Sequence, residues 1–283
     1  IKKISFKTTT PRTGFHSGEI HLQNDDMNQD NKYYFNFQVP DNINIGFLGL
    51  HDEAAYYFKK SIKALNHKSE IFNMTDYLPE KITNELLNND MIITSPTLLA
   101  NYEDSELNQY LFNGGHIIAF SDPNTKMEDF NALAESLDEI NDDFNKLKFI
   151  DLPQSFQELN YENIASPQLN DIFNNSQDRN IRFFSYFNMP YDPLNTMLTL
   201  KDGSSVWNRY VIGKGIFDIF AFSMDLKWTN FPIKGSFLPT VHYMLFSNPK
   251  YNVIKNQATN EHWSIPINEH MGGNLFHEYP NGV

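Results

Sequence analysis

The stretch Val206–Phe246 decides the fold class of this chain, and it reads VWNRYVIGKGIFDIFAFSMDLKWTNFPIKGSFLPTVHYMLF. Its Gly213-Lys214-Gly215 segment predicts a turn, because glycine reaches positive φ without steric cost. Residues 216–224 are then almost unbroken apolar sequence, which is typical of a strand buried on both faces. After a polar loop, one helical stripe follows, formed by Phe237, Leu238, Val241, Met244 and Leu245. A buried strand with a covering helix indicates an α/β sheet.

Upstream of this stretch, short apolar runs alternate with helical periodicity. Strands are expected at residues 43–50, 70–74, 90–94 and 116–120, and the segments between them carry apolar residues at helical spacing. Such alternation is typical of βαβ units. We therefore predict a flavodoxin-like, doubly wound and mainly parallel sheet over residues 41–250.

The two ends of the chain have a different character. Residues 1–40 read as three β-strands, at 3–7, 19–22 and 33–39, which are fewer than the roughly seven of an independent sandwich. We interpret them as the tail of a sandwich-like domain. Residues 251–283 are polar and weakly periodic, and we interpret them as a linker and the start of a following domain. The sequence is thus expected to be a piece of a longer protein.

Composition excludes several kinds of partner and chemistry. The formal charge of −13 argues against a nucleic-acid backbone or an anionic lipid surface as partner. The absence of cysteine excludes disulfides, thiolate metal sites and cysteine nucleophiles. No phosphate-cradling motif is present, and the imidazoles of His262, His270 and His277 are too widely spaced to predict a zinc site. We therefore expect neither a cofactor nor a bound metal.

Several features occur in an order that resembles one family. They are Asp30-Asn31-Lys32-Tyr33-Tyr34-Phe35, the strand at 43–50, Gly114-Gly115, Ser166-Pro167-Gln168-Leu169, Lys201-Asp202-Gly203, Gly213-Lys214-Gly215, Trp228 and Phe231-Pro232. Their order over most of residues 15–247 resembles the extracytoplasmic region of BatA-like, aerotolerance-regulator-type bacterial membrane proteins. The resemblance implies a class I glutamine amidotransferase-like domain and a periplasmic or extracytoplasmic location. It also implies anchoring through transmembrane segments outside this sequence, and protein partners in an envelope complex that include von Willebrand A-type domains.

Polar residues follow the predicted parallel strands, where ligands of doubly wound sheets bind. They are His51, Asp52, Glu53, Ser95, Thr97, Ser121 and Asp122. One interpretation is a hydrolytic or binding site. The alternative is that short polar residues here end strands and cap helices.

The catalytic residues that the resemblance implies are missing. Amidotransferases of this class use a cysteine nucleophile activated by a histidine, and the matching segment here is Ala119-Phe120-Ser121-Asp122-Pro123. We therefore favour a non-enzymatic domain that acts in ligand binding or protein assembly. One alternative is a serine-dependent hydrolase that uses Ser121, with His51 or His116 as its base. Another is a carbohydrate- or peptide-binding module.

Aromatic residues are the expected contacts for a partner, because aromatic side chains dominate binding energies at interfaces. The candidates are Tyr56, Tyr57 and Trp228. The sequence does not indicate an oligomeric state.

Overall fold

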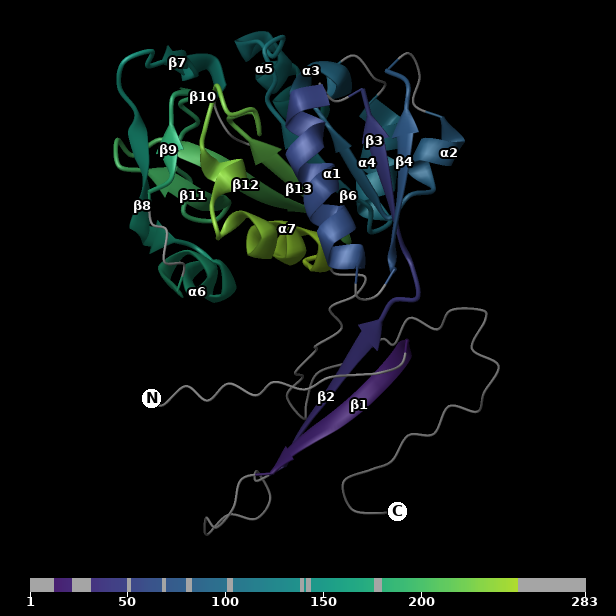
Figure 1. Ribbon diagram of the computed structural model, residues 1–283. Coiled ribbons are helices and arrows are strands. Elements are labelled where there is room, and N and C mark those ends of the chain that lie inside the picture. Colours follow the sequence, from purple (N-terminus) through teal and green to yellow (C-terminus); the bar gives the residue numbers. More distant parts are fainter. Residues whose placement is uncertain are drawn as a thin grey trace, which may run out of the picture. The chain divides into compact units, whose positions relative to one another are not determined.

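The computed structural model describes residues 13–21, 32–49, 52–67, 70–79, 83–100, 104–137, 140, 144–175 and 180–248 (Figure 1). The chain divides into two compact units. The larger contains residues 1–17 and 36–253, and the smaller contains residues 18–35 and 254–283.

The centre of the larger unit is a nine-stranded sheet. In spatial order its strands are β4 (Phe72–Tyr77), β3 (Ile43–Leu48), β5 (Met91–Thr94), β6 (His116–Phe120), β13 (Gly215–Phe220), β12 (Ser205–Ile212), β11 (Thr196–Leu200), β8 (Gln157–Ile164) and β9 (Arg182–Phe183). A small antiparallel pair, β7 (Phe149–Asp151) with β10 (Ser185–Phe187), forms a separate sheet.

The sheet is mixed, so the prediction of a flavodoxin-like, mainly parallel sheet is wrong. Strands β4, β3, β5, β6 and β13 are parallel to one another. From β13 to β9, every neighbouring pair is antiparallel. The physical reason lies in the connections, because the turns at 201–204 and 213–214 are too short for a parallel crossover and join their strands as hairpins.

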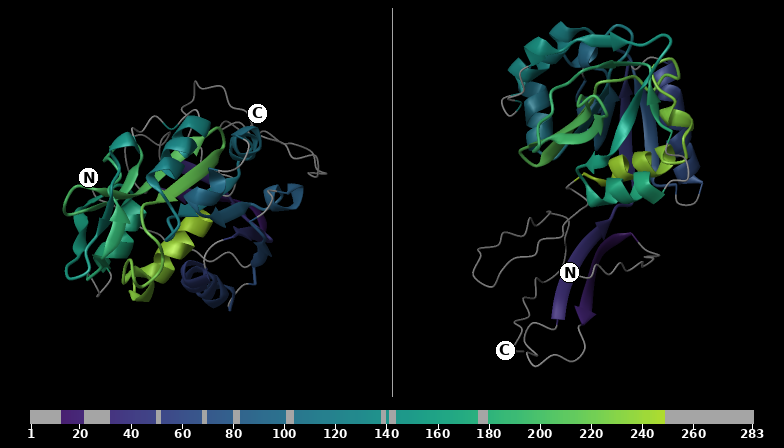
Figure 2. Two further views of the ribbon diagram at one scale, coloured as in Figure 1. Left: turned by 90° about the horizontal axis from the view of Figure 1, so that it is seen from above. Right: turned by 90° about the vertical axis from the view of Figure 1, so that its left-hand side faces the viewer.

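Helices cover both faces of the sheet (Figure 2). Helix α7 (Phe237–Phe246) lies between α1 (Asp52–Asn66) and α6 (Pro167–Asn175) on one face and contacts both. The opposite face carries α2 (Asn84–Leu87), whose Leu86 packs over β3, and α4 (Asp104–Phe112), which contacts β12 and β13. The remaining helical elements are α3 (Pro96–Leu99), α5 (Met127–Ser136), η1 (Phe144–Lys146) and η2 (Phe231–Ile233).

Aromatic side chains form the core between α1 and the sheet. The ring of Phe58 on α1 lies 5.5 Å from that of Phe120, which in turn lies 4.5 Å from Phe220. Trp207 on β12 stacks on Phe220 at 4.7 Å. All four side chains are fully buried, so this row ties a helix to three neighbouring strands through apolar contact.

The two glycines of the predicted turn serve different purposes. Gly213 has φ +58°, as the sequence predicted for a glycine turn. Gly215 does not have positive φ. Instead, a Cβ atom there would lie 2.3 Å from the carbonyl oxygen of Leu111 and 2.4 Å from that of Gly115. Glycine at 215 thus lets the end of α4 approach the start of β13.

Near the N-terminus, β1 (Gly14–His21) and β2 (Lys32–Val39) form a two-stranded sheet. β2 coincides with the strand predicted at 33–39, whereas the strand predicted at 19–22 overlaps only the end of β1. The third predicted strand, at residues 3–7, lies outside the described residues. So do the predicted linker at 251–283 and its three histidines.

Candidate functional site

The polar residues predicted to form a site do follow the parallel strands, but the structure commits them to local hydrogen bonds. The Asp122 carboxylate accepts from the Asn124 amide at 2.7 Å and from the Thr125 hydroxyl at 3.3 Å. The Thr97 hydroxyl, near the start of α3, donates to Asp129 on α5 at 2.8 Å. These bonds turn the chain after β6 and join α3 to α5, which is the capping role that was the alternative interpretation.

The switch point between β3 and β5 is filled by side chains. Gly49 follows β3 with φ +52°, and a Cβ atom there would lie 2.7 Å from atoms of both Leu98 and Pro79. Ser95, which follows β5, is fully buried, and its hydroxyl has no hydrogen-bond partner among the described residues. His51 lies outside the described residues, and Asp52 and Glu53 begin α1 with side chains that the structure does not describe.

Ser121 and His116 do not form a nucleophile and base. The Ser121 hydroxyl is fully buried and donates to the Phe220 carbonyl at 2.8 Å. His116 is the first residue of β6 and Ser121 follows its last, so about 16 Å of strand separates them at roughly 3.3 Å per residue. A pairing of Ser121 with His51 stays a prediction.

His116 belongs instead to a buried charged cluster on the α7 face of the sheet. Its Nε2 lies 2.8 Å from Oδ2 of Asp218. Arg209 donates to both carboxylate oxygens of Asp218 at 2.8 Å, and the Trp207 indole N–H donates to Oδ1 at 2.8 Å. Both Asp218 and His116 have no exposed surface. A buried carboxylate with four donors is typical of a structural ion pair.

The cluster fixes the charge state of its members. Burial by itself would raise the pKa of Asp218, but the charge of Arg209 and the hydrogen bonds from His116 and Arg209 outweigh it and hold this pKa well below its usual range. Burial lowers the pKa of His116 below its ordinary 6.5, and the bond to Asp218 offsets this only in part. Because the carboxylate carries no proton, Nε2 of the neutral imidazole is the donor. Its Nδ1 is buried and has no hydrogen-bond partner in the part of the chain that the structure describes.

This arrangement predicts a loss of stability in mild acid. As the pH falls below about 6.5, the unfolded chain takes up a proton at residue 116 that the folded chain does not accept until lower pH. The free energy of unfolding should therefore fall more steeply in the wild type than in His116→Gln, by up to about 1.4 kcal/mol per pH unit. Urea unfolding of both proteins at about pH 7.5 and about pH 5.5 measures this difference.

The comparison isolates residue 116. The pKa of His242 is also lowered by burial, so His242 contributes in the same direction in both proteins and cancels. Asp218 contributes only near and below its ordinary pKa of 3.8, outside this window. Equal pH dependence in the two proteins would show that folding does not lower the pKa of His116.

The three predicted aromatic contacts do not form one surface. Trp228 is only 7% exposed and packs 5.2 Å from the ring of Phe149, so it belongs to the core. Tyr56 on α1 is 53% exposed, and its ring lies 5.2 Å from that of the half-buried Tyr57. The two tyrosines remain candidates for partner contacts, whereas Trp228 does not.

Tyr57 lines a hollow of about 350 Å³ between α1, η2 and the start of α7. We call it the α1–α7 hollow, and its main lining residues are Tyr57, Lys60, Ala64, Ile233, Lys234 and Leu238. Ile233 is 61% exposed and Leu238 is 39% exposed. An exposed apolar hollow is a feature that sequence periodicity does not reveal, because η2 and α1 lie far apart in the chain.

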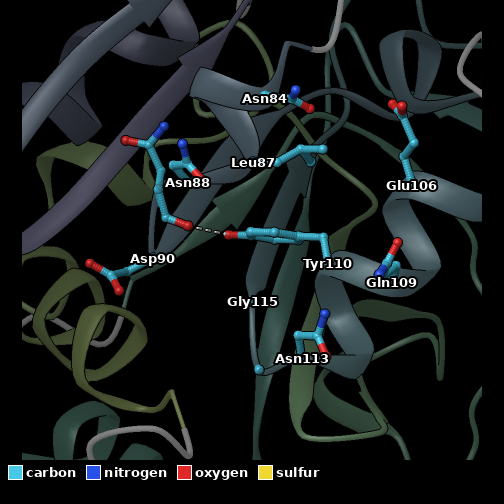
Figure 3. A pocket seen from close by; sticks show the side chains of 11 residues that line it. Asn84, Leu87, Asn88, Asp90, Glu106, Gln109, Tyr110, Asn113 and Gly115 are labelled. Atoms are coloured by element: carbon cyan, nitrogen blue, oxygen red, sulfur yellow. Dashed lines mark hydrogen bonds between the residues drawn. The ribbon is translucent and has the colours of Figure 1, made fainter. Parts of the chain in front are cut away.

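A second, polar hollow of about 430 Å³ lies between α2 and α4, next to the amino ends of β5 and β6 (Figure 3). We call it the α2–α4 groove, and its polar lining side chains include Asn84, Asn88, Glu106, Gln109, Tyr110 and Asn113. This groove was not predicted from the sequence. Its only signal is a concentration of asparagine and glutamine near 84–89 and 108–113, which resembles ordinary polar turns.

Within the described residues, no three histidine, aspartate or glutamate side chains are placed to hold a metal ion. In the same part of the chain, no helix combines the length and apolarity needed to cross a bilayer.

No protein-family model matches the chain, and no curated protein matches its sequence. Among solved structures, a cytoplasmic protein from Salmonella typhimurium is similar with a TM-score of 0.51 at 10% identity, covering 82% of this chain and 94% of that one. A second cytoplasmic protein, from Salmonella typhimurium LT2, gives 0.47 at 13% identity over 87% of this chain and 97% of that one. A β-galactosidase from Bacillus circulans sp. alkalophilus gives 0.42 at 11% identity over 75% of this chain and 32% of its own.

These comparisons correct one prediction and leave another open. The likeness to the first Salmonella protein shows a shared fold and nothing about activity. The two likenesses with TM-scores of 0.47 and 0.42 carry no argument. The prediction of a periplasmic or extracytoplasmic location is contradicted, because the first Salmonella protein, which shares this fold, is described as cytoplasmic. None of the three is described as BatA-like, so that resemblance stays a prediction.

Proposed function

We propose that this chain is a non-catalytic domain that docks a protein partner, and that its docking surface is the α1–α7 hollow. The observation that carries the proposal is the exposure of apolar side chains around a concave site. Ile233, Leu238 and Tyr56 are 61%, 39% and 53% exposed, and they border or extend the hollow. Partly exposed apolar residues around a concavity are typical of contact surfaces.

The buried serine and histidine support a non-catalytic role. The Ser121 hydroxyl is held by the Phe220 carbonyl, and His116 is held by Asp218. A serine nucleophile needs a base within hydrogen-bond reach and access to its substrate. Ser121 has no exposed surface, so it lacks that access.

The charges around the hollow indicate the chemistry of the partner. Lys60 and Lys234 line it, and no aspartate or glutamate is among its described lining residues. The Lys60 ammonium lies 5.4 Å above the Tyr56 ring, at the same edge. On a protein with formal charge −13, this local excess of lysine favours an acidic segment with apolar side chains on one face. We therefore commit to an acidic amphipathic segment of a partner protein.

The test uses two synthetic helical peptides of equal length. One carries leucine and phenylalanine on one face with glutamate elsewhere, and the other has lysine in place of every glutamate. We expect the acidic peptide alone to bind with a dissociation constant of about 1 mM or tighter by isothermal titration calorimetry. Ile233→Glu and Lys60→Glu should each weaken this binding about tenfold or more.

Val211→Glu is the matched control for Ile233→Glu. Val211 on β12 is 64% exposed and does not line the hollow. Binding of the acidic peptide should be unchanged in this variant and should weaken with added salt. Failure of the acidic peptide to bind, equal binding of the basic peptide, or an equal loss with Val211→Glu would each contradict the proposal.

A further inference from the structure

The α2–α4 groove combines a rigid floor with free polar side chains along its rim. The floor is Tyr110, whose hydroxyl lies 3.1 Å from the Asn89 carbonyl and 3.4 Å from the His116 carbonyl. A Cβ atom at Gly115 would lie 2.3 Å from the Tyr110 ring, so this ring rests directly on the backbone. Tyr110 therefore cannot change position without losing packing and hydrogen bonds together.

Asn89 completes the floor on the α2 side. Its side-chain N–H₂ donates to the Leu86 carbonyl at 2.8 Å, and to the Glu85 carbonyl and the Tyr77 hydroxyl at 3.1 Å each. Both Asn89 and Tyr110 are buried, at 8% exposure. Groups held by packing and hydrogen bonds in this way are preorganised, which lowers the entropic cost of binding.

The rim differs from the floor because its polar groups are exposed. Asn84 and Asn88 come from α2 and its end, and Glu106, Gln109 and Asn113 come from α4 and its end (Figure 3). None of these five side chains hydrogen-bonds to another residue in the described part of the chain. Each amide offers two donors and an acceptor, and Glu106 adds acceptors.

The charges of the groove restrict the ligand. Its described lining residues include Asp90 and Glu106 but no lysine, arginine or histidine. Among these residues a phosphate or carboxylate ligand would meet only negative charge. A cation is disfavoured too, since the described residues place no three carboxylate or histidine side chains together.

We infer that the α2–α4 groove binds a neutral polyhydroxylated ligand, a mono- or disaccharide. A sugar hydroxyl both donates and accepts, and neighbouring hydroxyls match the paired donor and acceptor of an asparagine or glutamine amide. Leu87 and the Tyr110 ring supply apolar surface for the C–H groups of a sugar ring. The volume of about 430 Å³ lies within the range of small-ligand sites. This site is separate from the α1–α7 hollow and goes beyond the proposed docking function.

Two-dimensional ¹H–¹⁵N NMR tests the inference directly, because side-chain N–H₂ groups give their own signals. The probes are glucose, galactose, mannose, N-acetylglucosamine, maltose and cellobiose, with inorganic phosphate and trialanine as the other ligand classes. We expect at least one saccharide to shift the side-chain signals of Asn84, Asn88, Gln109 and Asn113 in a saturable way. Phosphate and trialanine should leave these signals unchanged.

Substitutions in and outside the groove test where the saccharide binds. Gln109→Ala and Asn113→Ala should each weaken saccharide binding about three- to tenfold, as expected for loss of one or two hydrogen bonds. Their matched controls are Gln154→Ala, at an exposed glutamine outside the groove, and Asn131→Ala on α5. Neither control should change the affinity, and all four variants should unfold at nearly the wild-type temperature.

Each remaining outcome overturns the inference. No saturable shift with any of the six saccharides would exclude a saccharide site of useful affinity. Binding that survives both groove substitutions would place the sugar elsewhere. Saturable shifts of the groove signals with phosphate or trialanine instead would show a different ligand class.

Discussion

Replacing Asp218 with asparagine is expected to lower the free energy of unfolding by about 3–5 kcal/mol. The carboxylate accepts hydrogen bonds from Trp207, Arg209 and His116, and it is the counter-ion of the largely buried Arg209 guanidinium. Asparagine has nearly the same shape but no charge, so Arg209 would remain buried without compensation. Its N–H₂ group would also face donors instead of acceptors.

Urea unfolding at neutral pH measures this loss, and Glu158→Gln provides the control. Glu158 on β8 forms an ion pair with Lys201, but both side chains are substantially exposed. Such surface pairs contribute about 0–1 kcal/mol. A loss for Asp218→Asn no larger than that for Glu158→Gln would show that the buried cluster does not depend on its charge.

Gly215→Ala is expected to be comparably severe, with a loss of about 3 kcal/mol or more. The added methyl group would lie 2.3 Å from the Leu111 carbonyl oxygen and 2.4 Å from the Gly115 carbonyl oxygen. Both are backbone atoms, so no side-chain rotation relieves the contact. Either α4 or the start of β13 must move. The hydrogen bond from the Ile216 amide to the Gly115 carbonyl, at 3.1 Å, would then be disturbed.

Gly203→Ala separates this steric effect from the general effect of losing a glycine. Gly203 has φ +91°, but nothing lies within 4 Å of the position of its added Cβ atom. The expected loss is about 1–2 kcal/mol of backbone strain alone. Thermal unfolding of both variants makes the comparison. Equal losses at the two positions would mean that α4 yields easily and that the close approach at Gly215 is not important.

Much of the parallel half of the sheet was predictable, because its strands are short and almost entirely apolar. The strand predicted at 116–120 coincides with β6, and β3 and β5 lie within their predicted ranges. The antiparallel half was harder. Strand β8 reads QELNYENI and buries only Leu159 fully, so its sequence lacks the alternation that identifies a strand. Its pairing with β11 is also a contact between distant segments.

The direction of the second half could nevertheless have been inferred from its turns. The segment Lys201-Asp202-Gly203-Ser204 is a hairpin-turn signal, and 213–215 was predicted as a turn immediately before a buried strand. Two hairpins in succession require β11, β12 and β13 to alternate in direction. The βαβ pattern of residues 43–120 therefore does not continue through β11 and β12, where the two turns reverse the direction of the chain.

The candidate site was likewise predictable only where it depends on local sequence. Ser121 and His116 stand at opposite ends of one correctly predicted strand, so their separation followed from the sequence alone. The two hollows did not follow from it. Each is formed by segments that only the tertiary fold brings together, as η2 and α1 are. Local periodicity predicts which face of a helix is buried, but it does not predict which exposed faces meet.

The end of α7 is attached to the centre of the sheet and not to its border. The Asn248 side chain donates to the carbonyl of Gly114 at 3.2 Å and contacts that of Asp90 at 3.5 Å, at the entrances to β6 and β5. Both strands have a neighbour on each side. A mechanical load applied to the chain after residue 248 therefore acts first on the hydrogen bonds of Asn248 to the central strands, and no outer strand is pulled away from the sheet.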